Sequence, residues 1–539
     1  MRLEEQYAAP ASKLMDDYIN GKNGIYKYFS YEPNLEMFPD RMKVLEKHPV
    51  DRMKLSAIVR NYMKPNGISE KAEGHLRDLE NGAPVVVTGQ QAGLLTGPLY
   101  TVHKAISVIV LAKEAGARLN RKVVPVFWIA GEDHDLAEIS HLYREVNGRI
   151  DKLNFPHVEY GKNSASAAKL NKAKIHSYLE EYFRSLPETE HSKELHQLVF
   201  AFLDKADSFT DFFSAFINYF FQEEGLLYID AAYPELREYE SSYFLEMIGK
   251  SEAIAKAVVL SEQGLVEQGY NASIGAEFDA ANLFVTVQGE RILLQRDNGN
   301  FVGNNGAVTF TLVELQEIAR QNPERLSNNV VTRPLMQEMV FPVLAFVGGP
   351  GEIAYWAALK DAFKVMGMEM PVIMPRLGMT LVNRQVQTLM NKYELNFSEI
   401  VSEMKVADLK VELMNSIREK EAEALVEELK NQLELKYEDI LEKFSSISGG
   451  LAPIVEKNLQ IHLKQLSFLG NKLEDEVVLQ NSTQFNHYEC LENELIPNNS
   501  LQERIFNPLP YMNDYGMALV QDMLRLDFKY DKNHKIIYM

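Results

Sequence analysis

Residues 88–104, TGQQAGLLTGPLYTVHK, decide how this chain folds. They follow the apolar run 84–88 and lead into a helix-like stretch at 99–115. Glycines between a buried strand and a helix let backbone N–H groups approach a ligand, and the helix N-terminus favours an anion. The sequence therefore predicts a ligand-binding turn, with a turn that holds no ligand as the structural alternative.

The same alternation of strand and helix recurs along the chain. An apolar run at 123–129 precedes a helix-like stretch at 136–146, and runs at 340–347 and 371–374 flank the glycine turn 348–352. Continuous apolar strands that alternate with helices indicate a parallel sheet buried on both faces. We therefore predict a doubly wound α/β core, interrupted by a β-hairpin insert at 283–295.

The rest of the chain is mainly helical in pattern. Two long amphipathic stretches on either side of Gly449 and Gly450 predict an antiparallel coiled-coil hairpin that pairs with a second subunit, giving a homodimer. Two ordinary bundle helices are the alternative. The predicted divisions are a helical lead-in at 1–80, the first half of the core at 81–150, inserts with the β-hairpin at 151–335, the second half of the core at 336–388, the coiled-coil dimerisation domain at 389–480, and a segment at 481–539 that returns to the core.

Composition limits the classes of function. The chain of 539 residues carries 56 basic and 76 acidic side chains, and its net charge of -20 disfavours binding to nucleic acid. A single cysteine, Cys490, excludes an internal disulfide framework and a Cys-x-x-Cys zinc pair. With no signal-like N-terminus and no apolar stretch of about 18 residues, we expect a cytoplasmic protein that does not enter a membrane.

A cluster of ionisable residues follows the second predicted strand, at 130–135 (AGEDHD). Ligands bind at the carboxyl ends of parallel strands in this fold class. Asp133, His134 and Asp135 could there orient an amine, bind Mg²⁺ or act as acid and base. The alternative is a solvated loop that caps a helix, and we predict no resident metal ligand.

A second glycine turn mirrors the first across the predicted crevice. Gly349 and Glu352 lie in GGPGEIAYW at 348–356, again between a strand and a helix. Arg333, in NNVVTRP at 328–334, could hold a carboxylate through two hydrogen bonds. A structural salt bridge is the alternative for Arg333.

The first turn resembles the signature of class I aminoacyl-tRNA synthetases and related nucleotidyltransferases. Residues 96–103, TGPLYTVH, match the place where that family has His-x-Gly-His, which contacts the phosphates of ATP; His103 is retained, whereas Tyr100 and Val102 replace the first histidine and the glycine. The cluster GEDHD is similar to a Gly-x-Asp-x-x-Gly stretch of methionyl-type synthetases. This resemblance implies ATP or ADP as a candidate cofactor, and the cluster at 130–135 adds Mg²⁺ as a second candidate.

Four motifs together resemble the cysteine-adding enzymes of bacillithiol biosynthesis, the BshC family: TGQQAGLLTGPLYTVHK, GEDHD, NNVVTRPLMQE with GGPGEIAYW, and LQERIFNPLPYMNDYG. The resemblance covers essentially the whole chain. It implies a Rossmann-type core with connecting-peptide inserts, a coiled coil that builds a dimer, and addition of L-cysteine to glucosaminyl malate. It also implies a nucleotide cavity away from the core crevice, for which Gln502, Arg504 and Asn507 are candidates because they lie near the hairpin.

These observations combine into a mechanistic hypothesis. The cysteine carboxylate is activated at the first turn, where His103 and the backbone of Gln90 and Gln91 stabilise negative charge. Asp133, His134 or Asp135 accepts the amine proton, and Arg333 holds the malate carboxylate. An aminoacyl-tRNA-synthetase-like nucleotidyltransferase and a non-enzymatic dimeric scaffold are the rival functions. The predicted substrate-binding residues are Gln90, Gln91, Thr96, Gly97, Tyr100, Arg333, Gly349 and Glu352.

Overall fold

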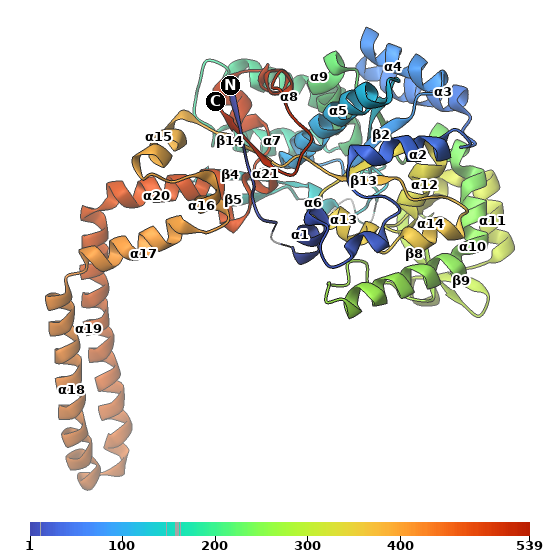
Figure 1. The fold of residues 1–539 in the computed structure, drawn as a ribbon. Coiled ribbons are helices and arrows are strands. Elements are labelled where there is room, and N and C mark those ends of the chain that lie inside the picture. The colour runs from blue at the N-terminus through green and yellow to red at the C-terminus, as the bar shows by residue number, and fades with distance from the viewer. Residues whose placement is uncertain (11, 147, 157–160, 162) are drawn as a thin grey trace. The chain divides into compact units, whose positions relative to one another are not determined.

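The computed structural model describes residues 1–10, 12–146, 148–156, 161 and 163–539 (Figure 1). The chain forms two units, the first made of residues 1–383 and 500–539 and the second of residues 384–499. The second unit is longer than the predicted coiled-coil domain at 389–480. It is longer because α20 (Ser482–Leu495) packs against α15 (Arg384–Lys392) and α17 (Lys405–Ile417).

A five-stranded parallel sheet forms the centre of the first unit. Its strands follow the order β13 (Val372–Pro375), β12 (Val343–Gly348), β2 (Val85–Gln90), β3 (Val124–Ile129) and β6 (Leu227–Asp230). The chain adds β3 and β6 on one side of β2 and then returns to add β12 and β13 on the other. The predicted doubly wound sheet is confirmed, and its order reverses between β2 and β12, where such sheets bind ligands.

The turn after β2 needs its glycines. Leu95, Thr96 and Gly97 have φ angles of 52°, 74° and 70° in succession. A Cβ atom on Gly93 would lie 2.9 Å from the Cα of Gly97. This tight turn feeds directly into α5 (Tyr100–Leu119), which packs on β2 and β3 (Figure 1).

Two sequence expectations are wrong in detail. The predicted helix at 136–146 is only the short α6 (Leu136–Ile139), because β4 (His141–Val146) pairs antiparallel with β5 (Arg149–Asn154). The lead-in is not wholly helical, since its first residues form β1 (Arg2–Gln6). In a separate small sheet, β15 (His534–Tyr538) pairs antiparallel with β1 and parallel with β14 (Met379–Val382).

The predicted β-hairpin insert is present. β7 (Ala280–Val287) and β8 (Glu290–Asp297) pair antiparallel across a turn at Gln288 and Gly289, whose φ angles are 51° and 86°. They belong to an antiparallel sheet with β9 (Asn300–Gly303), β10 (Val308–Thr311) and, beside β7, β11 (Leu326–Asn328). β8 and β11 supply Arg291 and Asn328 to the candidate site.

In the second unit, α18 (Lys420–Ile447) and α19 (Ala452–Gln480) run side by side (Figure 1). The short 3-10 helix η9 (Gly449–Leu451) joins them, and the Tyr437 hydroxyl donates a hydrogen bond across the pair to Asn458. The antiparallel helical hairpin is thus confirmed. Its only buried side chain is Val455.

Candidate active site

A crevice of about 680 Å³ opens at the switch point of the central sheet, over the carboxyl ends of β2, β3 and β12. Both glycine turns and the cluster after β3 contribute to its walls, as the sequence predicts. Nine of the predicted site residues line it: Gln90, Gln91, Tyr100, Asp133, His134, Arg333, Gly349, Glu352 and Arg504.

A buried lysine ties the two glycine turns together. Lys104 Nζ lies 2.9 Å from the Gly89 carbonyl oxygen, 2.9 Å from Gln90 Oε1 and 2.5 Å from Glu352 Oε2. Glu352 in turn accepts the Gly349 N–H at 2.8 Å. Burial lowers the pKa of Lys104, and the neighbouring Glu352 opposes this effect. Lys104 belongs to the first motif, yet only the fold reveals that it faces the crevice.

Two cationic side chains of the crevice have no acidic partner among the described residues. Arg333, on α12 (Thr332–Val340), donates to the Tyr355 hydroxyl and forms no salt bridge, so the structural alternative for this residue is not supported. Arg504, on α21 (Gln502–Ile505), also lines the crevice without an ion pair. Two such groups favour an anionic ligand.

The residues of the cluster after β3 have different surroundings. Asp133 Oδ2 accepts from Gln91 at 2.7 Å, and its Oδ1 lies 3.5 Å from an Arg291 nitrogen. Burial acts to raise the pKa of Asp133, but the Gln91 hydrogen bond and the Arg291 charge bring it below its usual value. His134 Nδ1 accepts from Arg291 at 3.0 Å. Asp135 is exposed and does not line the crevice.

His103 faces away from the crevice. The side chain is fully buried, and its Nδ1 lies 2.8 Å from Glu503 Oε2. Glu503 also pairs with Arg376 at 2.8 Å and accepts the Met379 N–H at 3.1 Å. Burial lowers the pKa of His103, so the imidazole is neutral near pH 7. The contacts of His103 therefore link it to the crevice only through Glu503 and Arg376, which lines the crevice.

The predicted nucleotide residues do not form one pocket. Gln502 is buried, with its amide bonded to the backbone N–H and C=O of Leu381, both at 2.8 Å. Asn507 is buried and donates to the Tyr182 hydroxyl at 2.8 Å. Their amides are engaged within the fold, which leaves Arg504 on the crevice. Thr96 and Gly97 line a small pocket that also includes Gln90, Gln91 and Tyr100.

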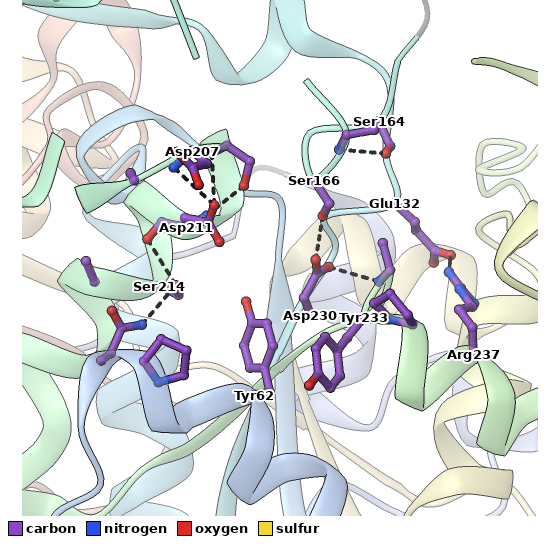
Figure 2. A pocket seen from close by; sticks show the side chains of 18 of the residues that line it. Tyr62, Glu132, Ser164, Ser166, Asp207, Asp211, Ser214, Asp230, Tyr233 and Arg237 are labelled. Atoms are coloured by element: carbon purple, nitrogen blue, oxygen red, sulfur yellow. Dashed lines mark hydrogen bonds and ion pairs between the residues drawn. The ribbon is translucent and has the colours of Figure 1, made fainter. Parts of the chain in front are cut away.

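A second cavity, of about 880 Å³, was not predicted from the sequence (Figure 2). It lies at the end of β6, beyond β3 from the glycine turns. Its acids, hydroxyls and aromatic rings are far apart in the sequence, so no local motif marks it. Residues that line it include Tyr62, Ser166, Asp211, Ser214, Asp230, Tyr233 and Arg237.

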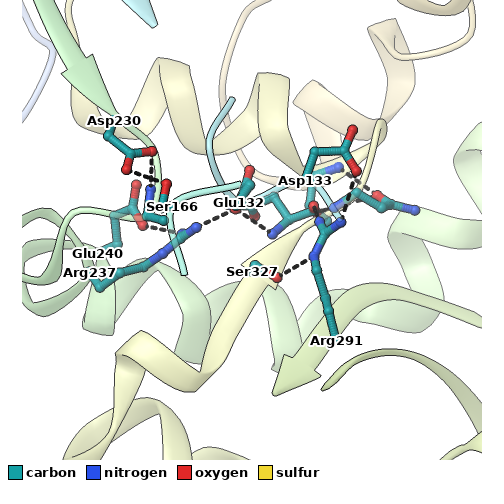
Figure 3. Close-up of polar contacts among 12 residues, drawn as sticks. Glu132, Asp133, Ser166, Asp230, Arg237, Glu240, Arg291 and Ser327 are labelled. Carbon is teal, nitrogen blue, oxygen red and sulfur yellow. Dashed lines mark hydrogen bonds and ion pairs between the residues drawn. The ribbon is translucent and has the colours of Figure 1, made fainter. Parts of the chain in front are cut away.

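Glu132 and Arg291 line both cavities. Figure 3 shows the polar contacts of their side chains. The Glu132 carboxylate pairs with Arg237 and accepts the Asn328 N–H at 3.1 Å. Arg291 donates to Ser327 Oγ at 2.9 Å and to the Asn328 carbonyl at 2.6 Å. A buried ionic network therefore forms the boundary between the two cavities.

The side-chain amide of Asn328, in the crevice wall, lacks hydrogen-bond partners among the described residues. The residue is 2% exposed, and neither its amide nitrogen nor its amide oxygen has a hydrogen-bond partner among the described residues. A buried amide without partners is costly unless a ligand supplies them. Sequence analysis quoted Asn328 within a motif but did not select it.

The described residues of the candidate site offer few ligands for a metal ion. Within the part of the chain that the structure describes, no group of three or more His, Cys, Asp or Glu side chains could hold a metal ion. The oxygens of Asp133 already accept from Gln91 and from backbone N–H groups. These residues do not fit a Mg²⁺ site by themselves. In the same described part, no helix is long and apolar enough to cross a membrane.

Comparison with known proteins gives matches along the whole chain. One family model, Bacillithiol biosynthesis BshC, N-terminal Rossmann-like domain, matches residues 1–377, and a second, the C-terminal coiled-coil domain, matches residues 379–539. Proteins named "Putative cysteine ligase BshC" are 43% identical in Lysinibacillus sphaericus, over 100% of both chains, and 37% identical in Oceanobacillus iheyensis, over 98% of both.

Among solved structures, the chain is similar to a protein titled as a "putative arginyl t-RNA synthetase" from Campylobacter jejuni. The identity is 10%, the TM-score is 0.22, and the match covers 89% of this chain and 100% of that one. A likeness at this score carries no argument about the fold.

Proposed function

The chain belongs to the BshC family of bacillithiol biosynthesis, and we propose that it is a ligase that joins the carboxyl group of L-cysteine to the amine of glucosaminyl malate, forming bacillithiol. The observation that carries this proposal is the crevice at the sheet's switch point with Arg333 and Arg504, two cations that lack acidic partners. The malate group has two carboxylates, and each guanidinium can hold one through charge-assisted hydrogen bonds.

Activation of the cysteine carboxylate is part of the proposal, because an amide does not form spontaneously in water from a carboxylate and an amine. ATP would supply this activation. Lys104 lines the crevice beside Gln90 and Glu352. It is therefore better placed than His103 to stabilise the negative charge that develops at the reacting carbonyl.

Asp133 and His134 would orient the incoming amine. The lowered pKa of Asp133 keeps it a carboxylate at neutral pH and makes it a weak proton acceptor. Both residues contact Arg291, so their positions are coupled to the boundary between the two cavities. The remaining predicted partner is a second copy of the chain, joined through the helical hairpin.

The assay uses purified protein with L-cysteine, glucosaminyl malate and each nucleoside triphosphate in turn, and follows the product by mass. Product that requires both substrates and a triphosphate supports the ligase. Cysteine-dependent exchange of pyrophosphate into ATP supports an adenylate, and its absence together with product formation supports an acyl phosphate. No product with any triphosphate contradicts the proposal and favours the scaffold.

Arg333→Gln tests the malate site within the same assay. We expect the KM for glucosaminyl malate to rise by about 10- to 100-fold, since a charge-assisted hydrogen bond contributes roughly 1.5–3 kcal/mol. The KM for cysteine should not change. Arg320→Gln, at a surface arginine that pairs with Glu317, is the matched control and should behave as wild type. An unchanged KM for glucosaminyl malate in Arg333→Gln would remove Arg333 from the site.

A further inference from the structure

Asn328 offers its side chain, and not its backbone, to the crevice. Its N–H donates to the Glu132 carboxylate at 3.1 Å, and its carbonyl oxygen accepts from Arg291 at 2.6 Å. Ser327, the residue before it on β11, lines the second cavity, whereas Asn328 lines the crevice. Successive side chains of a strand point to opposite faces. The side-chain amide of Asn328 therefore faces the crevice.

The Asn328 amide differs from another buried amide of the same unit. Asn513 is 1% exposed, its Nδ2 donates to the Pro187 carbonyl at 2.8 Å, and its Oδ1 accepts from Ser192 Oγ at 2.7 Å. Buried amides are normally paired in this way. At Asn328, which is 2% exposed, neither amide atom has a partner within the described part of the chain. Its amide therefore suits a ligand that supplies one donor and one acceptor.

Arg291 holds Asn328 next to the two residues that orient the amine in the proposed function. Its guanidinium donates to the Asn328 carbonyl at 2.6 Å and to His134 Nδ1 at 3.0 Å. The nitrogen that contacts His134 also lies 3.5 Å from Asp133 Oδ1, and Figure 3 shows this contact. The amide, the imidazole and the carboxylate therefore belong to one part of the crevice wall.

A neutral amide suits an amine that acts as a nucleophile. The amine attacks through its lone pair, and a bound proton would block that lone pair. A carboxylate favours the charged ammonium form, whereas an amide oxygen accepts one N–H without adding charge. The amide nitrogen remains free to donate to an oxygen beside the amine. In a glucosamine ring the carbon next to the amine carbon carries a hydroxyl group, so one amide can contact both groups.

We propose that Asn328 determines specificity for the amino sugar: its Oδ1 accepts an N–H of the neutral amine of glucosaminyl malate, and its Nδ2 donates to the neighbouring hydroxyl group. This inference rests on the proposed function, because it takes glucosaminyl malate as the substrate and keeps its amine in the crevice beside Asp133 and His134. The two hydrogen bonds orient the amine and require a hydroxyl group next to it. Asn328 thus selects sugars that carry this pair of groups.

Replacing the amide by an apolar side chain should change stability and binding in opposite directions. Asn328→Leu removes a buried group without partners in the free protein, so its denaturation midpoint should equal or exceed that of wild type. Its affinity for glucosaminyl malate, measured by calorimetry on the full-length protein without cysteine or nucleotide, should fall about tenfold. A residue with a structural role alone would lose stability and keep affinity. Asn328→Ala, which adds no bulk, repeats the binding measurement if leucine does not fit.

A matched variant and a substrate analogue identify the contact. Asn513→Leu breaks an amide that is bonded at both atoms, so it should lower the denaturation midpoint and leave the affinity for glucosaminyl malate unchanged. The 3-deoxy analogue of glucosaminyl malate lacks the hydroxyl group beside the amine. It should bind wild type about tenfold more weakly than glucosaminyl malate does, whereas Asn328→Leu should bind both compounds about equally. An equal penalty in the two proteins would overturn the assignment, as would no binding to wild type.

Turnover distinguishes this inference from the proposed function. If wild type forms the product and Asn328→Leu binds glucosaminyl malate as wild type does, the ligase stands and the role of Asn328 fails. If wild type forms no product with any triphosphate but binds glucosaminyl malate through Asn328, the ligase fails and the binding role stands. We expect product formation, with a KM for glucosaminyl malate raised about tenfold in Asn328→Leu and an unchanged KM for cysteine.

Discussion

Neighbouring residues on one helix meet opposite environments at the start of α5. His103 contacts Glu503 in the protein interior, whereas Lys104 faces the crevice and Glu352. Successive residues of a helix point about 100° apart, so adjacency in the motif does not imply a shared role. The family signature draws attention to the histidine, while the geometry favours the lysine.

His103→Ala should reduce stability more than it alters chemistry. Its loss removes one donor from buried Glu503, which keeps Arg376 and the Met379 N–H, so we expect a loss of roughly 1–3 kcal/mol in the free energy of unfolding. Denaturant melts measure this change. The pH profile of turnover should keep its shape, and His103→Asn, which retains an N–H donor, should recover part of the stability. A lost limb in the pH profile with normal stability would instead make His103 an acid or base.

The buried, ionised carboxylate of Asp230 should lower the free energy of unfolding at neutral pH. Burial raises the pKa of Asp230 to about 6, above its value in the unfolded chain. The folded state therefore binds more protons between about pH 4 and pH 6, and stability falls as the pH rises through this window. A shift of about two units corresponds to roughly 3 kcal/mol at most.

Asp230→Asn removes this penalty. Its stability relative to wild type should therefore increase from pH 4 to pH 6 and stay level above pH 7, as measured by denaturant melts at each pH. A difference that does not vary with pH would mean that Asp230 has an ordinary pKa.

At the scale of elements, the sequence predicts most of what the core requires. Valine-rich β2 and the other central strands are recognisable because both faces are buried and the runs are uniformly apolar. β4 is misread because residues 136–146 mix apolar and charged side chains at a spacing that also suits a helix, and pairing with β5 decides the outcome. β1 is missed because its partner β15 lies at the other end of the chain.

The candidate site, like the strands of the core, can be predicted from the sequence only in part. The glycine turns and the cluster after β3 are local signals, and the parallel sheet brings them together. Arg291, Arg376 and Asp230 come from strand ends and turns that carry no local signal of a site, and Asn328 is not singled out within its motif. Their roles depend on contacts between distant segments, which spacing alone does not report.

The turn between β2 and α5 should tolerate no side chain at Gly97. Its φ of 70° and ψ of -157° are accessible essentially to glycine alone, so Gly97→Ala should destabilise the protein by about 1–3 kcal/mol. The turn sets the start of α5, and turnover should fall as Tyr100 and Lys104 shift. Gly74→Ala is the matched control, because Gly74 lies inside α4 (Glu70–Glu80) with nothing within 4 Å of an added Cβ atom. There alanine should stabilise by up to about 1 kcal/mol.

At the scale of the whole molecule, the two units carry different features. The residues named for the crevice and the second cavity all belong to 1–383 and 500–539. The second unit instead exposes apolar side chains that its own hairpin does not cover, with Leu425 at 67% and Leu429 at 49% exposure on α18 and Phe468 at 57% on α19. Val426 lies opposite Gly470, so these side chains occur at one level of the hairpin.

An uncovered apolar surface at one level of a helical hairpin is expected to pair with a second copy of the chain. The double variant Leu425→Glu/Leu429→Glu would place two carboxylates into such an interface. We expect light scattering after size-exclusion chromatography to give a dimer for wild type and a monomer for the variant. The KM for glucosaminyl malate should not change, because Arg333 lies in the first unit. Lys443→Glu, an exposed charge reversal on the same helix, should remain dimeric. A monomeric wild type would show that the hairpin's apolar residues serve another partner, and a dimeric variant would place the interface elsewhere.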